Sequence, residues 1–193
     1  MLRWLVLAAC TSLTLGCSAA TSSWVRDDWA AQPASHVKRL HVAVSPLPNG
    51  DAGQGQLWAL LARRYVNQQR NFLVKQQSAL PVVDVAAACA GFDGLLLIAP
   101  VATQAGDDVT IGLDGLLVRC ADREPAWKGR VRGTWASTDP TVAAVRAHYV
   151  AELGPAVEPW VAPAFLALKA LVGMMPQPVL TDQDEMEKIE LGE

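Results

Sequence analysis

The sequence predicts a mixed α/β domain of the α+β type, with a single mixed sheet of about five strands and helices packed on it. Short alternating apolar segments and intervening helical patterns indicate this class. A hydrophobic content of 51% against 18% charged residues is enough for a packed core. We divide the chain into an apolar leader (1–16), a polar tether (17–35), the domain (36–175) and an acidic tail (176–193).

The leader has the pattern of a secretory signal peptide. Arg3 precedes a short apolar run, and no other charge occurs before Arg26. A membrane-spanning helix needs about 20 apolar residues, so this run is too short to be one. The segment Leu13-Thr14-Leu15-Gly16-Cys17 resembles the lipobox of bacterial lipoproteins, although leucine is usual where Thr14 stands.

Two other interpretations of the leader stay open, and a second position for the lipobox is weaker than Cys17. The leader is alternatively an ordinary signal peptide cleaved near Ala20, or the apolar start of a cytosolic protein. Residues Leu7-Ala8-Ala9-Cys10 fit the box better than the later segment, but they leave an apolar region too short for a signal. We therefore assign the lipobox to Cys17.

The lipobox resemblance implies attachment to a membrane through lipid on Cys17. In that family the cysteine is joined to diacylglycerol, the leader is cut before it, and the new amine is acylated. Three chains make a permanent anchor, because one chain binds only marginally. An Asp after the cysteine tends to retain lipoproteins in the inner membrane; Ser18 stands here, which favours the outer membrane. We expect the periplasmic face of that membrane rather than the cell surface.

The charge of the chain gives no reason to expect a nucleic-acid partner. The formal net charge is −3, and it becomes −4 once Arg3 leaves with the leader. The tether is small and polar but carries Trp24 and Trp29. These indoles either rest at the membrane interface, where tryptophan is favoured, or pack on the domain.

Hydrophobic periodicity predicts five strands in the domain, at 36–46, 80–85, 93–101, 109–120 and 127–135. Pro81 places the second strand near an edge. The third is apolar on both faces and is expected at the centre of the sheet. In the fifth, Trp127 and Val131 share one face, and basic side chains occupy the other.

Helical patterns connect or follow these strands. Helices are expected at 54–74, 86–90, 139–153 and about 165–172. Asp139-Pro140 is a good helix start, whereas prolines at 155, 159 and 163 are expected to disrupt the turns before the last helix. A strand–helix–strand unit that leads into an antiparallel meander predicts the mixed sheet.

Three segments resemble a group of bacterial envelope lipoprotein domains: VKRLHVAVSPL, CAGFDGLLLIAPV and GLLVRCADREPAWKG. The group includes the curli-secretion pore lipoprotein, activators of penicillin-binding proteins and the amino-terminal domain of the Tol-Pal translocation protein. The chain is also similar to small uncharacterised lipoproteins of myxobacteria and leptospires. The resemblance covers about residues 37–153, supports the fold and implies no catalytic residues. Segments that build a curli pore are absent from the sequence.

Cys89 and Cys120 form an even pair in the mature chain, which favours a disulfide in an exported protein. A loop of this size would stabilise by about 3–4 kcal/mol if unstrained. Buried free thiols are one alternative. A metal pair is the other, but it lacks His or Cys neighbours at ligand spacing.

The sequence predicts no catalytic residues, metal or cofactor. His36, His41 and His148 stand at no recognisable ligand spacing, and there is no Gly-x-Ser-x-Gly elbow. We expect His41 to be a satisfied packing residue. The glycines at 50, 53 and 55 lack the Lys-Ser or Lys-Thr of a phosphate loop.

We expect a non-catalytic binding or scaffold lipoprotein that engages another envelope protein. Lys128, Arg130 and Arg132 form a basic row that suits acidic partners or phosphates, or is simply a solvated strand face. The alternative function is a structural subunit or secretion accessory of an envelope complex. A hydrolytic envelope enzyme is the interpretation we favour least, and the sequence leaves the oligomeric state open.

The tail is strongly acidic and predicts a marginal helix. Its acidic residues are Asp182, Asp184, Glu185, Glu187, Glu190 and Glu193, against one Lys188. Short helices are rarely stable alone in water. We therefore expect a mobile arm that docks weakly on the basic row or on a partner, and that high salt releases.

Overall fold

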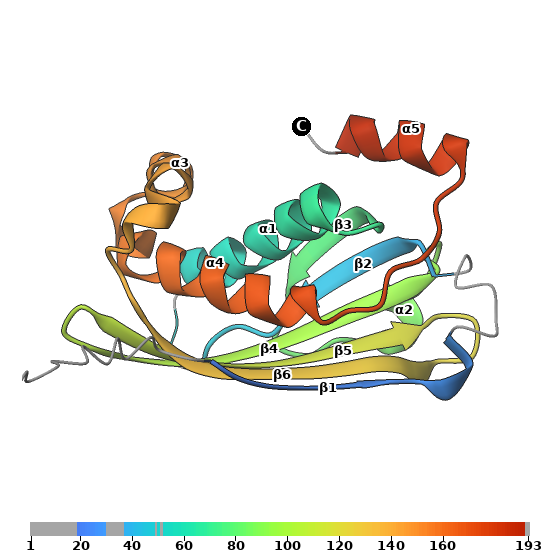
Figure 1. Ribbon diagram of the computed structural model, residues 1–193, viewed down its shortest axis with the longest axis horizontal. Coiled ribbons are helices and arrows are strands. Elements are labelled where there is room, and N and C mark those ends of the chain that lie inside the picture. Colours follow the sequence, from blue (N-terminus) through green and yellow to red (C-terminus); the bar gives the residue numbers. More distant parts are fainter. Residues whose placement is uncertain (1–18, 30–36, 49, 51, 192–193) are drawn as a thin grey trace, which may run out of the picture.

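A computed structural model shows one six-stranded mixed sheet with most helices packed on one side of it (Figure 1). The structure describes residues 19–29, 37–48, 50 and 52–191. The strands are β1 (Ala20–Val25), β2 (Arg39–Val44), β3 (Leu73–Ala79), β4 (Gly94–Ala105), β5 (Asp108–Arg119) and β6 (Glu124–Ala136). The predicted fold class is confirmed, with six strands in place of about five.

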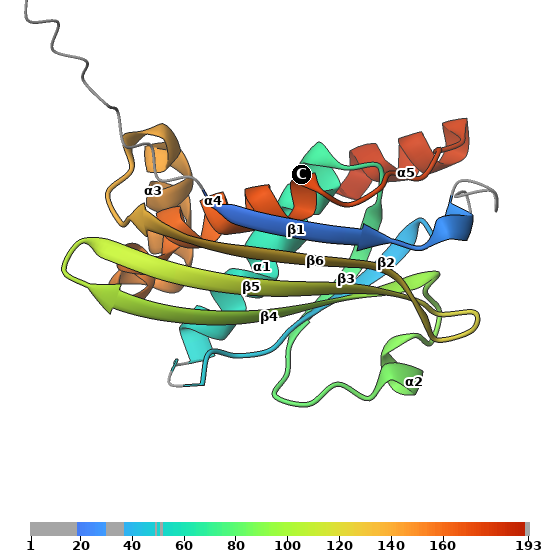
Figure 2. The ribbon, with the colours of Figure 1, turned by 60° about the horizontal axis from the view of Figure 1, so that its bottom comes forward.

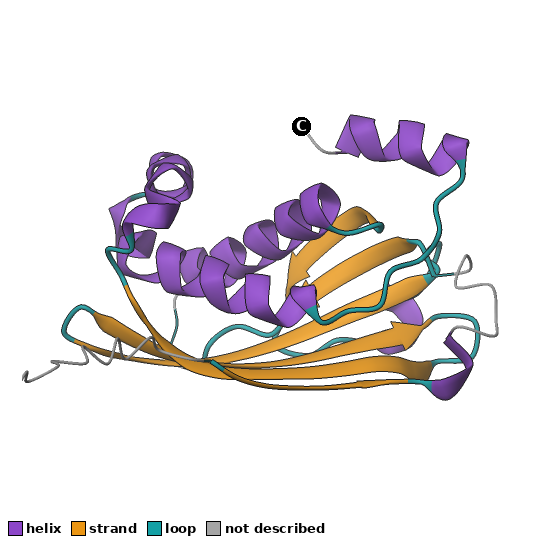
Figure 3. Ribbon diagram, viewed as in Figure 1, coloured by secondary structure: helices purple, strands orange, loops and turns teal. Residues whose placement is uncertain are grey.

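The strand order is β1-β6-β5-β4-β2-β3. The helices are α1 (Ala52–Gln69), α2 (Val85–Ala88), α3 (Ala143–Leu153), α4 (Glu158–Gly173) and α5 (Asp182–Leu191), with short 3-10 turns η1 (Asp27–Trp29), η3 (Pro140–Val142) and η4 (Pro155–Val157) (Figure 3). Strand β2 pairs in parallel with β3 on one side and with β4 on the other. The segments that contain α1 and α2 return the chain to the end of the sheet at which β2 begins, so the three strands run in the same direction. Strands β4, β5 and β6 form an antiparallel meander through short turns.

The main core lies between the sheet and the pair α1 and α4 (Figure 1). Leu57 and Trp58 from α1, Leu168 from α4 and Leu113 from β5 are all fully buried. Burying each such side chain contributes about 1.5–3 kcal/mol. This layer therefore supplies most of the stabilisation that burial gives the fold.

Two glycines make room for the largest side chain of β6 in this core. A Cβ atom on Gly129 would lie 2.3 Å from Cζ2 of Trp127, and one on Gly115 would lie 2.9 Å from Cζ3 of the same ring. Leu171 of α4 closes the slot above both glycines. The indole therefore lies flat over two strands, a packing that any larger residue at 115 or 129 would disturb.

Helix α4 begins earlier than expected and runs through two prolines. Pro159 stands in the first turn, where a backbone N–H has no helical partner in any case. Pro163 is buried against the core, and this packing offsets the hydrogen bond that it cannot donate. Within the described residues, the stretch Pro155–Gly173 is long and apolar enough to cross a membrane, but half of it is buried as in a core helix.

Strand β3 occupies residues 73–79, not the expected 80–85. Helix α1 ends at Gln69, earlier than its predicted end, and Asn67 holds the strand that follows. The Asn67 amide oxygen accepts a 2.7 Å hydrogen bond from the Val74 backbone N–H, and its Nδ2 donates to the Val74 carbonyl. The ladder stops at Leu80, because the next residue, Pro81, has no N–H to donate.

Part of the expected tether is a strand. Residues Ala20–Val25 pair antiparallel with β6, with Ala20 opposite Arg132 and Val25 opposite Trp127. The pairing satisfies the outer edge of the long strand β6, which would otherwise face solvent. Trp29 packs against the main core, whereas the Trp24 side chain is 46% exposed.

Cys89 and Cys120 form the predicted disulfide, with Cα atoms 5.3 Å apart. Helix α2 leads into it, and its cap residue Asp84 accepts hydrogen bonds from the backbone N–H groups of residues 86 and 87. The bridge joins this segment to the end of β5. It therefore fixes α2 over a small second core around Leu95 and Val118, on the face opposite α1.

The acidic tail is docked, and not on the basic row. Helix α5 lies beside the beginning of β3, where Lys38 Nζ and Asp184 Oδ2 are 2.5 Å apart and both side chains are buried. Arg39 Nη2 binds Asp184 and Glu187, and Glu187 also binds Lys75. The hydrogen bond from Lys38, with help from Thr181, holds the pKa of Asp184 well below its usual range. The weak surface docking expected for this tail is therefore wrong: a partly buried ionic cluster holds α5.

Candidate functional site

The sheet has one covered and one largely open face. Figure 2 shows the open face toward the viewer, with α1 and α4 behind the strands and α2 at one end. Leu95 and Val118 lie under the α2 segment at that end. The remaining area, between α2 and the β4–β5 turn, is the face on which we place the candidate site.

The basic row lies on this open face. Lys128, Arg130 and Arg132 stand at alternate positions of β6, while Trp127 and Val131, on the other face of the strand, are fully buried on the helix side. The structure thus places the three predicted site residues together on one surface. It also makes β6 an inner strand, because β1 covers its edge, so the row does not serve to protect a free edge.

Asp114 on β5 partners both arginines of the row. Its Oδ1 lies 2.6 Å from Arg130 Nε, and its Oδ2 lies 3.0 Å from Arg132 Nη2. Burial acts to raise the pKa of Asp114, but the two guanidinium hydrogen bonds outweigh it, and the net pKa is below its ordinary value. Sequence analysis did not single out Asp114; its place opposite Arg130 depends on strand register.

Lys128 has a different neighbour. Its Nζ lies 5.7 Å from the centre of the Trp24 ring, which β1 brings to the open face. Such cation–π contacts contribute about 0.5–1 kcal/mol at exposed sites. Among the described residues, no carboxylate forms an ion pair with Lys128, so its charge is available to a ligand.

A groove of about 700 Å³ runs beside these charges. Leu97 of β4 and Leu116 of β5 lie opposite each other in it, and Trp24 and Val83 also line it. Lys128, Arg130 and Asp114 supply its polar groups. An apolar surface with a few placed charges is typical of a binding site, and here six separate chain segments build it.

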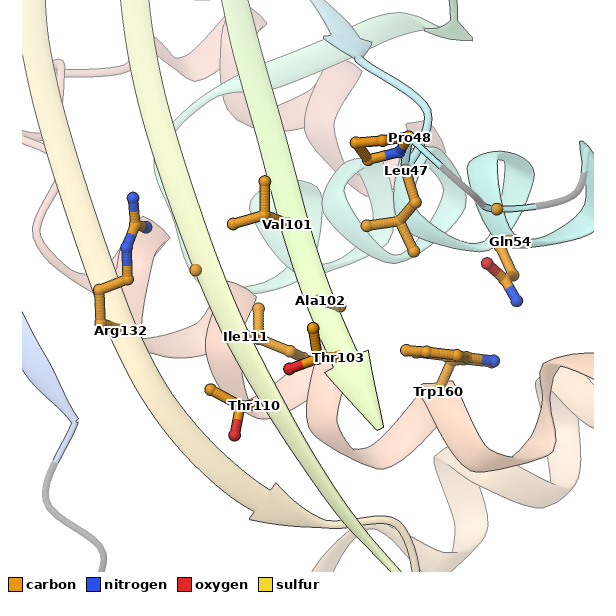
Figure 4. A pocket seen from close by; sticks show the side chains of 12 residues that line it. Leu47, Pro48, Gln54, Val101, Ala102, Thr103, Thr110, Ile111, Arg132 and Trp160 are labelled. Carbon is orange, nitrogen blue, oxygen red and sulfur yellow. The ribbon is translucent and has the colours of Figure 1, made fainter. Parts of the chain in front are cut away.

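A smaller pocket of about 330 Å³ lies where β4 extends beyond β2 (Figure 4). Val101 and Thr103 come from β4, Leu47 from the loop after β2, and Trp160 from α4. Arg132 lines this pocket also, next to Gly112, so the basic row ends there. Pro100 lies just beyond the end of the β2–β4 pairing, where β4 has a partner strand only on its β5 side, so its missing N–H costs no bond to β2.

The histidines give little support to catalysis. His41 is buried, and its ring nitrogens contact the Ala88 carbonyl at 3.1 Å and Ser78 Oγ at 2.9 Å, as expected of a packing residue. His148 pairs with Glu152 on an exposed helix surface. His36 lies outside the described residues. In the part of the chain that the structure describes, no three His, Cys, Asp or Glu side chains are grouped to hold a metal ion.

Cys17, the predicted lipidation site, lies outside the described residues, so its modification stays a prediction. The first described strand begins at Ala20, close behind it in the sequence. Sequence analysis missed the groove, because its lining comes from β1, β4, β5 and β6 together. The one local signal was the alternation of basic residues in β6.

Comparison with known proteins places the chain in no family. No protein-family model matches it, and no curated protein does. Among solved structures, a PelC dodecamer from Paraburkholderia phytofirmans is 11% identical, with 75% of this chain and 98% of that chain covered and a TM-score of 0.43. Lipoprotein GNA1162 from Neisseria meningitidis is 13% identical, covers 60% and 96%, and gives a TM-score of 0.40. At these values neither likeness assigns a function to this chain.

Proposed function

We propose that the protein is a non-catalytic lipoprotein of the bacterial envelope that binds another envelope component through the open face of its sheet. Lipid on Cys17 holds it at the periplasmic face of the outer membrane. The observation that carries the binding role is the groove, where Leu97, Leu116 and Trp24 lie beside Lys128 and Arg130. Leu97 and Leu116 are half-buried against the second core, and Trp24 is 46% exposed, so the groove offers a partner an apolar floor that is still open to solvent.

The chemistry of the groove fits an acidic partner segment with apolar side chains. Leu97 and Leu116 offer an apolar floor, and Lys128 offers a charge with no carboxylate partner among the described residues. Arg130 and Asp114 satisfy one another, so a ligand gains less from them. A partner carboxylate near Lys128, followed by an apolar side chain over Leu116, would use both features.

The disulfide supports a location outside the cytoplasm. Bridges such as Cys89–Cys120 form and persist in oxidising compartments, including the bacterial periplasm. An exported chain with a lipobox and an internal disulfide suits the envelope. The basic row does not make the protein basic as a whole, because acidic residues elsewhere give the chain a net charge of −3.

A photo-crosslinking experiment in cells tests the binding role. A photoreactive residue replaces Leu116 in the groove, and a matched control replaces Lys169 on α4, away from the open face. We expect adducts from position 116 and few from position 169. The additional change Lys128→Glu should remove those adducts while protein levels stay unchanged, because it repels an acidic partner.

The result also separates a binding module from a subunit of an assembly. Adducts with a different envelope protein support the binding module. Adducts with masses that are multiples of this chain alone would favour a self-assembling structural subunit. Equal crosslinking at positions 116 and 169, or adducts that Lys128→Glu does not change, would contradict a role for the open face.

A further inference from the structure

The described fold begins very close to the predicted lipid. Strand β1 starts at Ala20, three residues after Cys17. Three peptide units span at most ~11 Å even when fully extended. With β1 paired along its length to β6, no long tether separates a lipid on Cys17 from the folded domain. The lipid must therefore hold one particular end of the sheet at the membrane.

Strand register identifies that end. Ala20 is opposite Arg132, Arg132 is opposite Gly112, and Gly112 is opposite Val101. Beyond this level lie the β4–β5 turn and the last residues of β6. Figure 2 shows the start of β1 on the same side of the molecule as this turn and helix α3.

The ionic cluster that holds α5 lies at the other end. Arg39 starts β2, and the next residue, Leu40, is opposite Gly94. From there the pairing continues to Arg119 and to Glu124, the first residue of β6. Eight residues of strand separate Glu124 from Arg132, a distance of ~26 Å along β6. The acidic helix α5 therefore lies well away from Ala20.

The end near Ala20 carries groups that suit the glycerol and phosphate region of a bilayer. Val101 is 50% exposed, and Trp160 lines the pocket of Figure 4 together with Arg132. Asp107 and Asp108 also lie at the turn. Charge alone would therefore not attract the end of the sheet near Ala20 to an anionic membrane. The short link between Ala20 and the lipid on Cys17 would hold this end at the membrane instead.

We propose that the β4–β5 turn end of the sheet rests on the phospholipid surface, with α5 and the disulfide end pointing away from the membrane. The proposal rests on the lipidation of Cys17 that is part of the proposed function. It leaves the groove on the open face accessible from the periplasm. It also places the exposed Met186 and Ile189 of α5 away from the lipid.

Site-specific fluorescence on the purified lipoprotein tests this orientation. Since Cys89 and Cys120 are joined and Cys17 carries lipid, an introduced cysteine is the thiol that takes a dye. Ala105→Cys labels the turn end, and Gln183→Cys labels α5; both positions are exposed. The proteins are placed in phosphatidylethanolamine/phosphatidylglycerol vesicles with nitroxide-labelled phospholipid as quencher. We expect quenching to be severalfold stronger at position 105 than at position 183.

A spacer variant shows whether the short link is the cause. A Gly/Ser insertion of about ten residues after Ser18 has an r.m.s. span of ~17 Å and should abolish most quenching at position 105 without releasing the protein. Equal quenching at the two positions, or quenching at 105 that the spacer leaves unchanged, would overturn the proposal. Failure of the lipidation itself has a separate readout: the native chain would take up no labelled palmitate, and Cys17→Ser would not release it from membranes.

Discussion

The two faces of strands β5 and β6 differ in burial and in the kind of interaction that their side chains make, although the same two stretches of backbone form both faces. On the helix side, Leu113 and Trp127 are fully buried under α4. On the open side, the side chains of Asp114 and Arg130 are 45% and 63% exposed and interact mainly through charge. The comparison teaches that alternation along a strand separates the residues that stabilise this fold from those available for recognition.

The magnitudes of the two kinds of interaction differ accordingly. Burying a large apolar side chain removes it from water at about 25 cal/mol per Å². An exposed ion pair contributes about 0–1 kcal/mol, because water screens it and ordering the side chains costs entropy. Stability should therefore respond to changes on the helix side and much less to changes on the open side.

The largest effect is expected from Trp127→Ala. The change removes a fully buried indole from the slot over Gly115 and Gly129, and we expect a loss of about 3–5 kcal/mol in unfolding free energy. Lys128→Ala, one residue away on the open face, removes only the exposed contact with Trp24 and should change it by about 1 kcal/mol or less. Urea unfolding followed by circular dichroism measures both, and similar losses would show that the two faces do not differ as described.

A glycine pair gives a sharper comparison, because the same atom is added on opposite faces. In Gly129→Ala the new methyl would meet the Trp127 ring, fixed in the core, and should cost about 1–3 kcal/mol. In Gly112→Ala it would meet the Arg132 guanidinium, the mobile end of an exposed side chain, and should be nearly neutral. Thermal unfolding of the two variants decides this; a larger loss for Gly112→Ala would be the opposite of our expectation.

The smallest effect is expected from Asp114→Asn. Because the folded pKa of Asp114 lies below its ordinary value, its carboxylate contributes stability above about pH 4, and this contribution disappears as the pH falls through the folded pKa. We expect the variant to lose less than about 1 kcal/mol at pH 7, and less still in high salt. Denaturation at pH 7 and pH 3 checks this, since a loss that persists at pH 3 would have another cause.

The sequence predicted the basic row of the candidate site, but it did not predict the residues that line the groove beside the row. The alternation in residues 127–132 predicted the basic row, because a strand sends successive side chains to opposite faces. Trp24 was assigned to a tether, since Ala20–Val25 has no apolar alternation and forms a strand only because β6 offers an edge. Asp114, Leu97 and Leu116 joined the site through register, which no local pattern specifies.

The rest of the molecule shows the same difference between features that local sequence patterns predict and features that depend on tertiary contacts. The sequence by itself predicted the fold class, the pairing of Cys89 with Cys120 and the two faces of β6, because each depends on local spacing or on hydrophobic periodicity. The lipobox at Cys17 stays a prediction from the sequence. Only the tertiary structure decided that β1 belongs to the sheet and that α5 is held through buried Asp184 and Lys38. The physical reason is that backbone pairing at an edge and a buried ion pair 146 residues apart in sequence depend on partners that only the folded chain brings together.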